Sequence, residues 1–265
     1  MSAVNLSSSA RSGLSVLRSV ADQMEVTQKR LATGKAVNSA VDNASRFFSA
    51  SKMDARAASI DNLMEGVTVA QTTLKAAGEG IKGIQGVIKQ ARALTGQALA
   101  SDTATRKVLA EQFNTLAAEV TKLVADSKVN GSNLLAGNSI SVVLNEDGTS
   151  KVDIAGFSIT TFDDAENNWA TVDDITASVD ALTTLSTDLE TDAAKFGSSQ
   201  SLIDVRKDFN AALSNLLKSG SNDLTAADMD QEAANLMALQ TRQQMAATAL
   251  SIMQSSESTA LRLLR

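Results

Sequence analysis

The sequence predicts a mainly α fold: a long antiparallel helical bundle, or coiled-coil rod, with one small β-hairpin region. Apolar residues recur at alternating steps of three and four over most of the chain, the spacing of coiled-coil helices. None of the 265 residues is proline, although average usage would give roughly a dozen, so nothing interrupts long helices. Only 3% of the residues are aromatic. Burial must therefore rest on Leu, Ile, Val, Met and Ala, which suits close helix packing.

The last stretch, residues 228–265, is predicted to form one amphipathic helix because it contains no glycine or proline. Between Glu232 and Glu257 its only charged residue is Arg242. A helix with an apolar seam and no turn to fold it back needs a partner elsewhere. The seam residues are Leu236, Leu239, Gln243, Ala246, Leu250, Met253, Glu257, Ala260 and Leu264.

A matching helix is predicted near the N-terminus, and Gly34 can end it in the left-handed conformation. Its seam is Leu14, Leu17, Ala21, Met24, Gln28 and Leu31. Two such ends favour a terminal coiled-coil domain of residues 1–43 and 224–265; the alternative is two ordinary surface helices on one domain. The predicted interface consists of Leu14, Leu17, Met24, Leu31, Leu236, Leu239, Leu250, Met253 and Leu264.

A much longer helix is predicted from Asp42 to about Ala100, where large apolar residues recur at intervals of seven. At 1.5 Å per residue it would be about 80 Å long. Several glycines lie inside it, each costing about 1 kcal/mol relative to alanine. Either a neighbouring helix approaches the backbone there, or the glycines soften the rod. These glycines are Gly78, Gly80, Gly83, Gly86 and Gly96.

The helical pattern breaks at Ser101-Asp102-Thr103, residue types that cap helices, and then resumes from Leu109 to Leu123. Asn130-Gly131 is a turn signal. Beyond it, Ile140 to Leu144 and Lys151 to Ile159 are β-branched and partly alternating, so a β-hairpin is predicted at about 138–162.

After Trp169 the sevenfold spacing returns, and near Ser198 the seam shifts to Leu202, Val205, Phe209, Leu213 and Leu216. A break is predicted at residues 218–223. Residues 44–223 are thus expected to form a rod domain, with the two termini side by side at one end. Its predicted core is Met53, Ile60, Val67, Leu74, Ile81, Ile88, Phe113, Leu116, Leu182, Leu189, Phe196 and Phe209.

Composition excludes much enzyme chemistry. The chain has neither His nor Cys, so cysteine nucleophiles, Ser/His/Asp triads and His-ligated zinc are impossible. A net charge of −6 without a basic cluster argues against nucleic acid. The sequence contains no run of ~18 apolar residues, so no membrane span is predicted. Residues 1–6 lack the features of a secretory signal.

Three acidic clusters are the remaining candidates for chemistry: Asp163-Asp164, Asp173-Asp174 and the series Asp228, Asp230 and Glu232. Acidic residues are favoured at helix starts by the backbone dipole. A capping or solvated role is therefore the favoured interpretation, and no catalytic residue, cofactor or metal site is predicted.

Two stretches resemble a known family. Residues 31–44, Leu-Ala-Thr-Gly-Lys-Ala-Val-Asn-Ser-Ala-Val-Asp-Asn-Ala, resemble the N-terminal signature of bacterial flagellins. The C-terminal signature is matched by Ala227-Asp228-Met229, residues 232–235, Leu239 to Gln244, and Leu261 to Leu264. One departure is Asn43, where the family usually has a second Asp. The variable outer domains of the family are absent from the predicted architecture.

The resemblance implies an extracellular subunit of the flagellar filament, with the paired terminal helices forming an inner tube and the longer helices a layer around it. It implies as partners other flagellin copies, the flagellar export apparatus, an export chaperone, and hook-associated and cap proteins, with export that needs no cleaved signal peptide. The alternatives are a hook-filament junction protein, or a secreted effector or enzyme on a coiled-coil scaffold.

Toll-like receptor 5 recognises some members of this family on the long rod helix. The stretch that resembles the receptor-activating pattern is residues 88–94, in which Arg92 and Leu94 agree with it. Gln90 stands where the pattern has Arg, and loss of a guanidinium removes a bidentate ion pair. Weak or absent activation is therefore expected.

Overall fold

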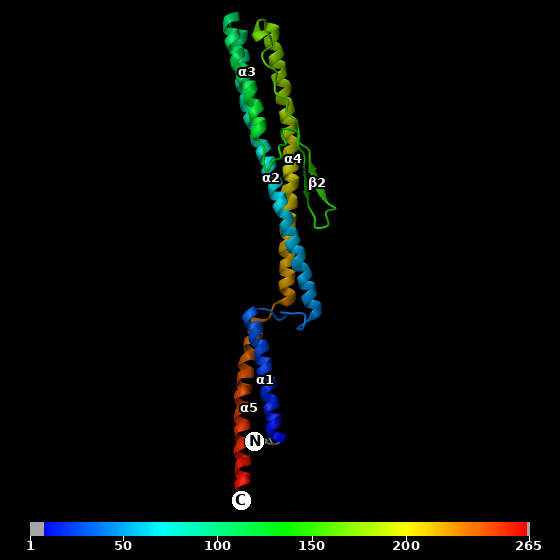
Figure 1. Ribbon diagram of the computed structural model, residues 1–265, viewed down its shortest axis with the longest axis vertical. Coiled ribbons are helices and arrows are strands. Elements are labelled where there is room, and N and C mark those ends of the chain that lie inside the picture. The colour runs from blue at the N-terminus through cyan, green and yellow to red at the C-terminus, as the bar shows by residue number, and fades with distance from the viewer. Residues whose placement is uncertain (1–7, 264–265) are drawn as a thin grey trace. The chain divides into compact units, whose positions relative to one another are not determined.

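The computed structural model describes residues 8–263 and confirms the mainly α fold (Figure 1). Contacts divide the chain into a terminal unit, residues 1–55 with 216–265, and a central unit, residues 56–215. The elements in order are α1 Ser8–Thr33, α2 Ala44–Leu99, α3 Thr103–Asp126, β1 Ile140–Val143, β2 Lys151–Ile154, the 3-10 helix η1 Glu166–Trp169, α4 Val172–Thr225 and α5 Met229–Leu263.

Polar side chains and glycine set the helix ends where the sequence predicts them. Gly34 follows α1 with a φ of 68°, in the left-handed region that glycine tolerates best. Asn43 accepts a hydrogen bond from the Arg46 amide at 3.0 Å, so it caps α2 as an aspartate would. Asp102 accepts from the Thr105 amide at 2.8 Å, and this bond lowers the pKa of Asp102.

The central unit is built on one continuous apolar core shared by α2, α3 and α4, which lie side by side in Figure 1. An aromatic cluster contributes to it: the Phe113 ring lies 4.7 Å from Phe162 and 4.9 Å from Trp169. Trp169 is fully buried and its indole N–H donates to Ser178 Oγ at 3.0 Å. The sequence pattern gives no hint of this cluster, because Phe162 and Trp169 lie outside the periodic helices.

The hairpin forms as an antiparallel pair with Ile140 opposite Ile154 and Val143 opposite Lys151. Its second strand is shorter than predicted. From Gly156 the chain leaves β1 and pairs with the loop after α3, where the Phe157 amide donates to the Leu134 carbonyl at 2.7 Å. A Cβ at Gly156 would lie 2.0 Å from the Asn138 carbonyl oxygen, so only glycine permits this approach.

The predicted helix break at residues 218–223 is wrong, because α4 continues to Thr225. Gly220 is needed there for packing: a Cβ at this position would lie 3.3 Å from the sulfur of Met53. The Thr225 hydroxyl donates to the Ser221 carbonyl at 3.0 Å, so these polar residues bond to their own helix.

The predicted domain boundaries are at residues 43 and 223. In the structure the two units meet at residues 55 and 215, about ten residues away. The start of α2 and the end of α4 contact each other within the terminal unit, as the Met53 and Gly220 pair shows. Met53, predicted for the rod core, thus belongs to the terminal unit and is half-buried there.

The glycines of α2 differ in what surrounds them. A Cβ at Gly80 would lie 2.2 Å from Ser127 Oγ and 2.6 Å from Leu135 Cδ1. No atom lies within 4 Å of a Cβ built at Gly78, Gly86 or Gly96. Close approach therefore explains Gly80, whereas the other three leave open space beside the helix within the described chain.

We expect Gly80→Ala to lower the free energy of unfolding by about 1–3 kcal/mol relative to Gly78→Ala, because the added methyl group overpacks the contact with Ser127 and Leu135. Gly78→Ala itself should raise stability by up to about 1 kcal/mol through helix propensity. Chemical denaturation followed by circular dichroism measures both. Equal effects of the two substitutions would contradict the close packing at Gly80.

Candidate assembly surfaces

The terminal unit is a pair of antiparallel helices, α1 and α5, which lie side by side in Figure 1. Near the start of α1, a Cβ at Gly13 would lie 3.1 Å from Leu250 Cδ1 on α5. Near the end of α1, Arg30 Nη1 lies 2.8 Å from Glu232 Oε1. The early part of one helix thus meets the late part of the other.

The face of α1 that meets α5 is rotated slightly from the predicted seam. Leu17, Met24 and Leu31 are half-buried. The other line of contact contains Gly13, Val20 and Thr27, of which Val20 and Thr27 are buried. Leu14, predicted for the interface, is 36% exposed. The rotation brings Gly13, Val20 and Thr27 into the contact in place of Leu14, Ala21 and Gln28.

On α5 most of the predicted seam residues whose side chains are described are buried or half-buried. Leu239 is buried, and Leu236, Leu250 and Met253 are half-buried. Leu264 lies outside the described residues. Gln243, also on the predicted seam, is exposed.

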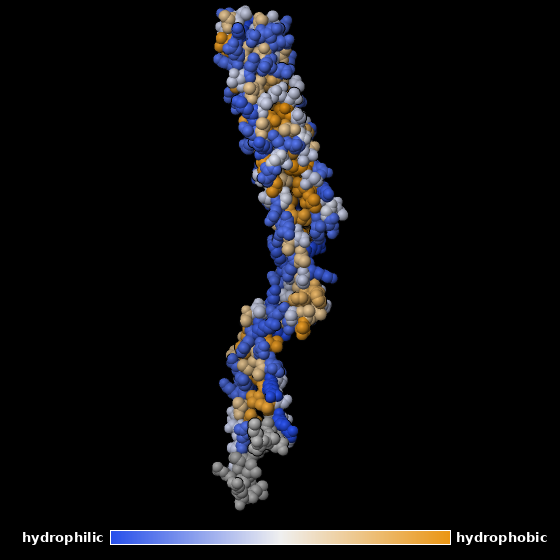
Figure 2. Space-filling model, in the orientation of Figure 1, coloured by the Kyte–Doolittle hydropathy of each residue, from blue (hydrophilic) through white to orange (hydrophobic). Residues whose placement is uncertain are grey.

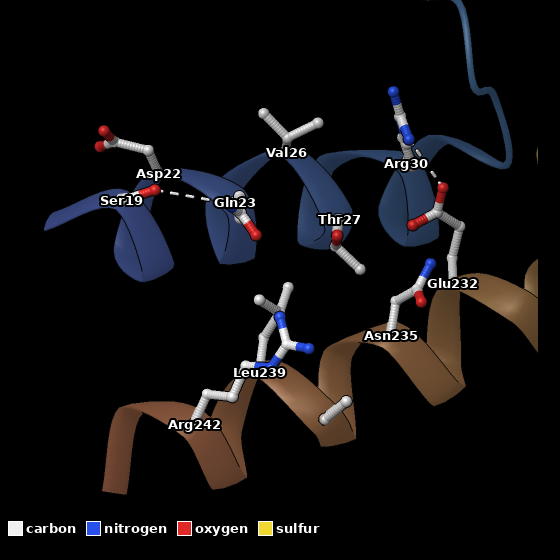
Figure 3. Close-up of a pocket in the computed structure, with 11 residues that line it drawn as sticks. Ser19, Asp22, Gln23, Val26, Thr27, Arg30, Glu232, Asn235, Leu239 and Arg242 are labelled. Carbon is white, nitrogen blue, oxygen red and sulfur yellow. Dashed lines mark hydrogen bonds and ion pairs between the residues drawn. The ribbon is translucent and has the colours of Figure 1, made fainter. Parts of the chain in front are cut away.

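A groove of about 510 Å³ runs between the two helices (Figure 3). Glu232 is 8% exposed, so the predicted solvated or capping role for this carboxylate is wrong. It pairs with Arg30 instead, while its other oxygen, Oε2, is buried without a hydrogen-bond partner among the described residues. Asp228 is the residue that caps α5, accepting from the Asp230 and Gln231 amides at 3.1 Å.

Backbone hydrogen bonds join the segment after α1 to the segment between α4 and α5. The Ala36 amide donates to the Thr225 carbonyl at 2.7 Å, and the Ala227 amide donates to the Gly34 carbonyl at 2.9 Å. We call residues 34–37 and 225–227 the terminal clasp. It fixes where α1 ends and α5 begins relative to each other.

In the central unit most of the predicted core residues are buried. Leu116 is half-buried and packs against the same core. The residues that are buried are Ile60, Val67, Leu74, Ile81, Ile88, Phe113, Leu182, Leu189 and Phe196.

The assignment of Phe209 to the core is wrong, because its side chain is 56% exposed. The seam shift predicted near Ser198 is wrong for the same reason, since Leu202 and Val205 are 45% and 63% exposed. The inward face of this part of α4 carries Lys207, Asn210 and Ser214 instead. Figure 2 shows hydrophobic side chains at the surface of both units.

The stretch that resembles the receptor-activating pattern does not form one surface. Gln90 and Leu94 line a groove of about 410 Å³ between α2 and α3, together with Leu116. Arg92 turns toward α4, where Nη2 donates to the Leu182 carbonyl at 3.4 Å.

The acidic clusters at Asp163 and Asp173 are exposed. Asp174 accepts a hydrogen bond from the Thr171 amide at 2.8 Å, which lowers the pKa of Asp174 and caps α4. Among the described residues, no group of three or more His, Cys, Asp or Glu side chains is placed to hold a metal ion. No helix of the described chain is both long and apolar enough to span a membrane.

Paired terminal helices, a helical central unit and uncovered apolar faces define a structural protein built for self-association. Comparison with known families agrees. Residues 4–140 match the bacterial flagellin N-terminal helical region, and residues 179–264 match the bacterial flagellin C-terminal helical region.

Two of the similar proteins cover the whole chain, and a third covers part of it. Flagellin FljO of Caulobacter vibrioides is 30% identical over 279 residues, spanning 100% of this chain and 99% of the relative. The flagellin of Brucella melitensis is 28% identical over 282 residues, spanning 100% of both chains. Flagellin A of Rhizobium meliloti is 46% identical over 79 residues, 30% of this chain and 20% of the relative. The chain belongs to the bacterial flagellins and is a structural subunit of the extracellular flagellar filament.

We expect Arg30→Gln to weaken the α1 and α5 pair by about 1–3 kcal/mol, because Glu232 is then buried without its charged partner. Hydrogen exchange of the α1 and α5 amides measures the change in local opening. The double variant Arg30→Gln with Glu232→Gln should recover much of the loss, since it removes the buried charge. If the double variant opens as readily as the single one, the ion pair is not what holds the helices.

Proposed function

We propose that α1 and α5, the helices of the predicted terminal domain (residues 1–43 and 224–265), form the inner tube of the filament, and that the helices of residues 44–223 form the layer outside it. The predicted interface residues Leu17, Met24, Leu239 and Leu250 would then hold the two helices of each copy together. The exposed apolar residues of the terminal unit would contact neighbouring copies. The observation that carries this proposal is the number of apolar side chains that the α1 and α5 pair leaves uncovered.

These side chains lie on both helices. Val16 and Val26 on α1 are 54% and 46% exposed. On α5, Met237, Met245 and Ile252 are 65%, 59% and 60% exposed. Each is comparable in size to the residues inside the pair, so covering them with copies of the same chain would remove substantial apolar area from water. An isolated pair of such helices would leave this apolar area exposed to water.

A second observation concerns charge on α5. Arg242 is the only charged residue between Glu232 and Glu257, and it lines the groove with α1, toward which its side chain turns in Figure 3. The remaining surface of this stretch therefore carries no charge. A channel wall of this kind would not retain passing chains electrostatically, which supports the inner-tube position.

The partners implied by the family resemblance belong to the same proposal: the export apparatus, an export chaperone, and hook-associated and cap proteins. Export of unfolded subunits fits a chain of 265 residues with no proline and no cysteine. Neither prolyl isomerisation nor disulfide formation would delay refolding at the filament tip. No observation favours a hook-filament junction protein or a secreted effector.

We expect the purified chain to grow into long uniform filaments from filament seeds, as seen by electron microscopy. Leu239→Asp places a charge in the α1 and α5 seam, where Leu239 is 7% exposed, and should raise the critical concentration for growth at least about tenfold. Gln240→Asp, at an exposed neighbouring position, adds the same charge outside the seam and serves as the control. Growth that stops at short capped structures would instead indicate a junction protein.

We also expect weak or no activation of Toll-like receptor 5 by this chain in reporter cells. Gln90→Arg should raise the response about tenfold or more, because a charged hydrogen bond to a receptor carboxylate would become available. Gln97→Arg, one heptad further along α2 and also exposed, is the matched control. A strong response from the unmodified chain would refute the expectation.

A further inference from the structure

The end of α4 within the central unit carries an apolar stripe on its exposed face. Leu202, Val205 and Phe209 lie on one stripe and are 45%, 63% and 56% exposed. We call these three residues the α4 ridge. Their spacing of three and four residues is that of a helix face that packs against a partner.

The opposite face of the same segment points inward and carries the fully buried Ile203 followed by polar residues. Asn210 is 4% exposed and donates to the Leu144 carbonyl at 3.1 Å. Ser214 is 1% exposed and donates to Asp61 Oδ1 at 2.7 Å. These hydrogen bonds satisfy the buried groups, so the α4 ridge has no place inside its own unit.

A groove of about 450 Å³ lies nearby between α2 and α4. Leu74, Ile81 and Phe196 line it and are 3%, 2% and 4% exposed. Gly78 and Gly197 also line it, one from each helix, and a Cβ at either would meet no atom within 4 Å. We call this the glycine groove. Within the described chain nothing occupies the space that two missing side chains leave open.

We propose that the glycine groove of one copy receives the α4 ridge of a second copy. The inference rests on the proposed function, because filament assembly supplies the second copy. At 3.6 residues per turn, Gly197 lies about a third of a turn around α4 from the centre of the ridge. One copy can therefore offer its ridge to one neighbour and its groove to another.

Such a contact joins two different surfaces, which is the arrangement that produces open helical polymers when its rotation does not close a ring. The fit is chemical as well as steric. Large apolar side chains enter an apolar groove whose glycines let the incoming helix approach closely.

Charges at the borders of the two surfaces are complementary. Lys75, Glu79 and Lys82 line the glycine groove, and Glu79 and Lys82 pair with each other at 2.6 Å. Lys75 can therefore pair with Asp208, an exposed neighbour of the α4 ridge. Gln200, also in the groove, donates to Asp204 at 2.8 Å, while its Oε1 is buried without a partner among the described residues. Arg206, on the other border of the ridge, is a donor that a second copy would bring to this groove.

The test is crosslinking through introduced cysteines. The chain contains no cysteine of its own, so a thiol-specific reagent reacts only at the introduced positions. Val205→Cys and Lys82→Cys, which lines the glycine groove one turn from Gly78 and leaves both glycines in place, are made as separate variants and co-assembled with an excess of the unmodified chain, so that filaments form. A short thiol-specific crosslinker is added and the products are identified by mass spectrometry. Val108→Cys with Lys82→Cys is the matched control, because Val108 on α3 is 54% exposed in the same unit.

We expect dimers that join position 205 of one chain to position 82 of another, at a yield at least about tenfold above the control pair. Intact filaments without this product, or with equal yield from the control pair, would overturn the proposal while leaving the filament function standing. Failure of the unmodified chain to form filaments from seeds would instead overturn the proposed function.

A second measurement separates assembly from folding. Gly78→Ala should leave the unfolding of the single chain unchanged or slightly more stable, but raise the critical concentration for filament growth about tenfold, because the methyl group fills the groove. Gly96→Ala, at another open glycine of α2 outside the groove, should leave growth unchanged. Equal growth of the Gly78→Ala variant and the unmodified chain would contradict the proposal.

Discussion

The constraint on which this structure depends is that its helices carry more apolar faces than one chain can cover. The α1 and α5 pair uses one stripe of each helix and leaves Val26, Met237 and others exposed. The central unit buries a continuous core among α2, α3 and α4 and still leaves Leu202, Val205 and Phe209 outside. On the inward face of α4, Asn210 and Ser214 stand where a core leucine would be usual, and both make hydrogen bonds there. Folding and assembly thus draw on different faces of the same helices.

Helix identity and helix ends could be predicted from the sequence because both depend on local chemistry. The sevenfold spacing, the capping by Asp102 and the left-handed Gly34 each act within a few residues. Local sequence patterns could not predict whether an apolar face of a helix points into the chain's own core or outward. The residues 202, 205 and 209 form a regular seam in sequence, but periodicity does not state whether the seam meets its own chain or another.

Residues with two possible roles account for the other differences. Gly220 and its polar neighbours resemble a helix break, yet the glycine serves contact with Met53 inside a continuous helix. Glu232 lies in the first turn of α5, where an acidic residue would complement the helix dipole. In the structure it forms an ion pair with Arg30 in the groove between α1 and α5. Both outcomes depend on a residue far away in the sequence. Family signatures identified the protein, whereas the pairing of Arg30 with Glu232 became visible only in three dimensions.

The terminal clasp has a consequence for the order in which the molecule folds. It joins residues 34–37 to residues 225–227, and within the described chain the helix that packs along α1 is α5. The central unit is one continuous segment, residues 56–215, so it can fold as soon as that segment is free. The terminal unit must wait for nearly the whole chain, since closing so long a loop comes before its contacts are gained. In a chain released from its N-terminus onward, α1 would therefore stay unpaired until α5 was released, and the terminal unit would be completed last.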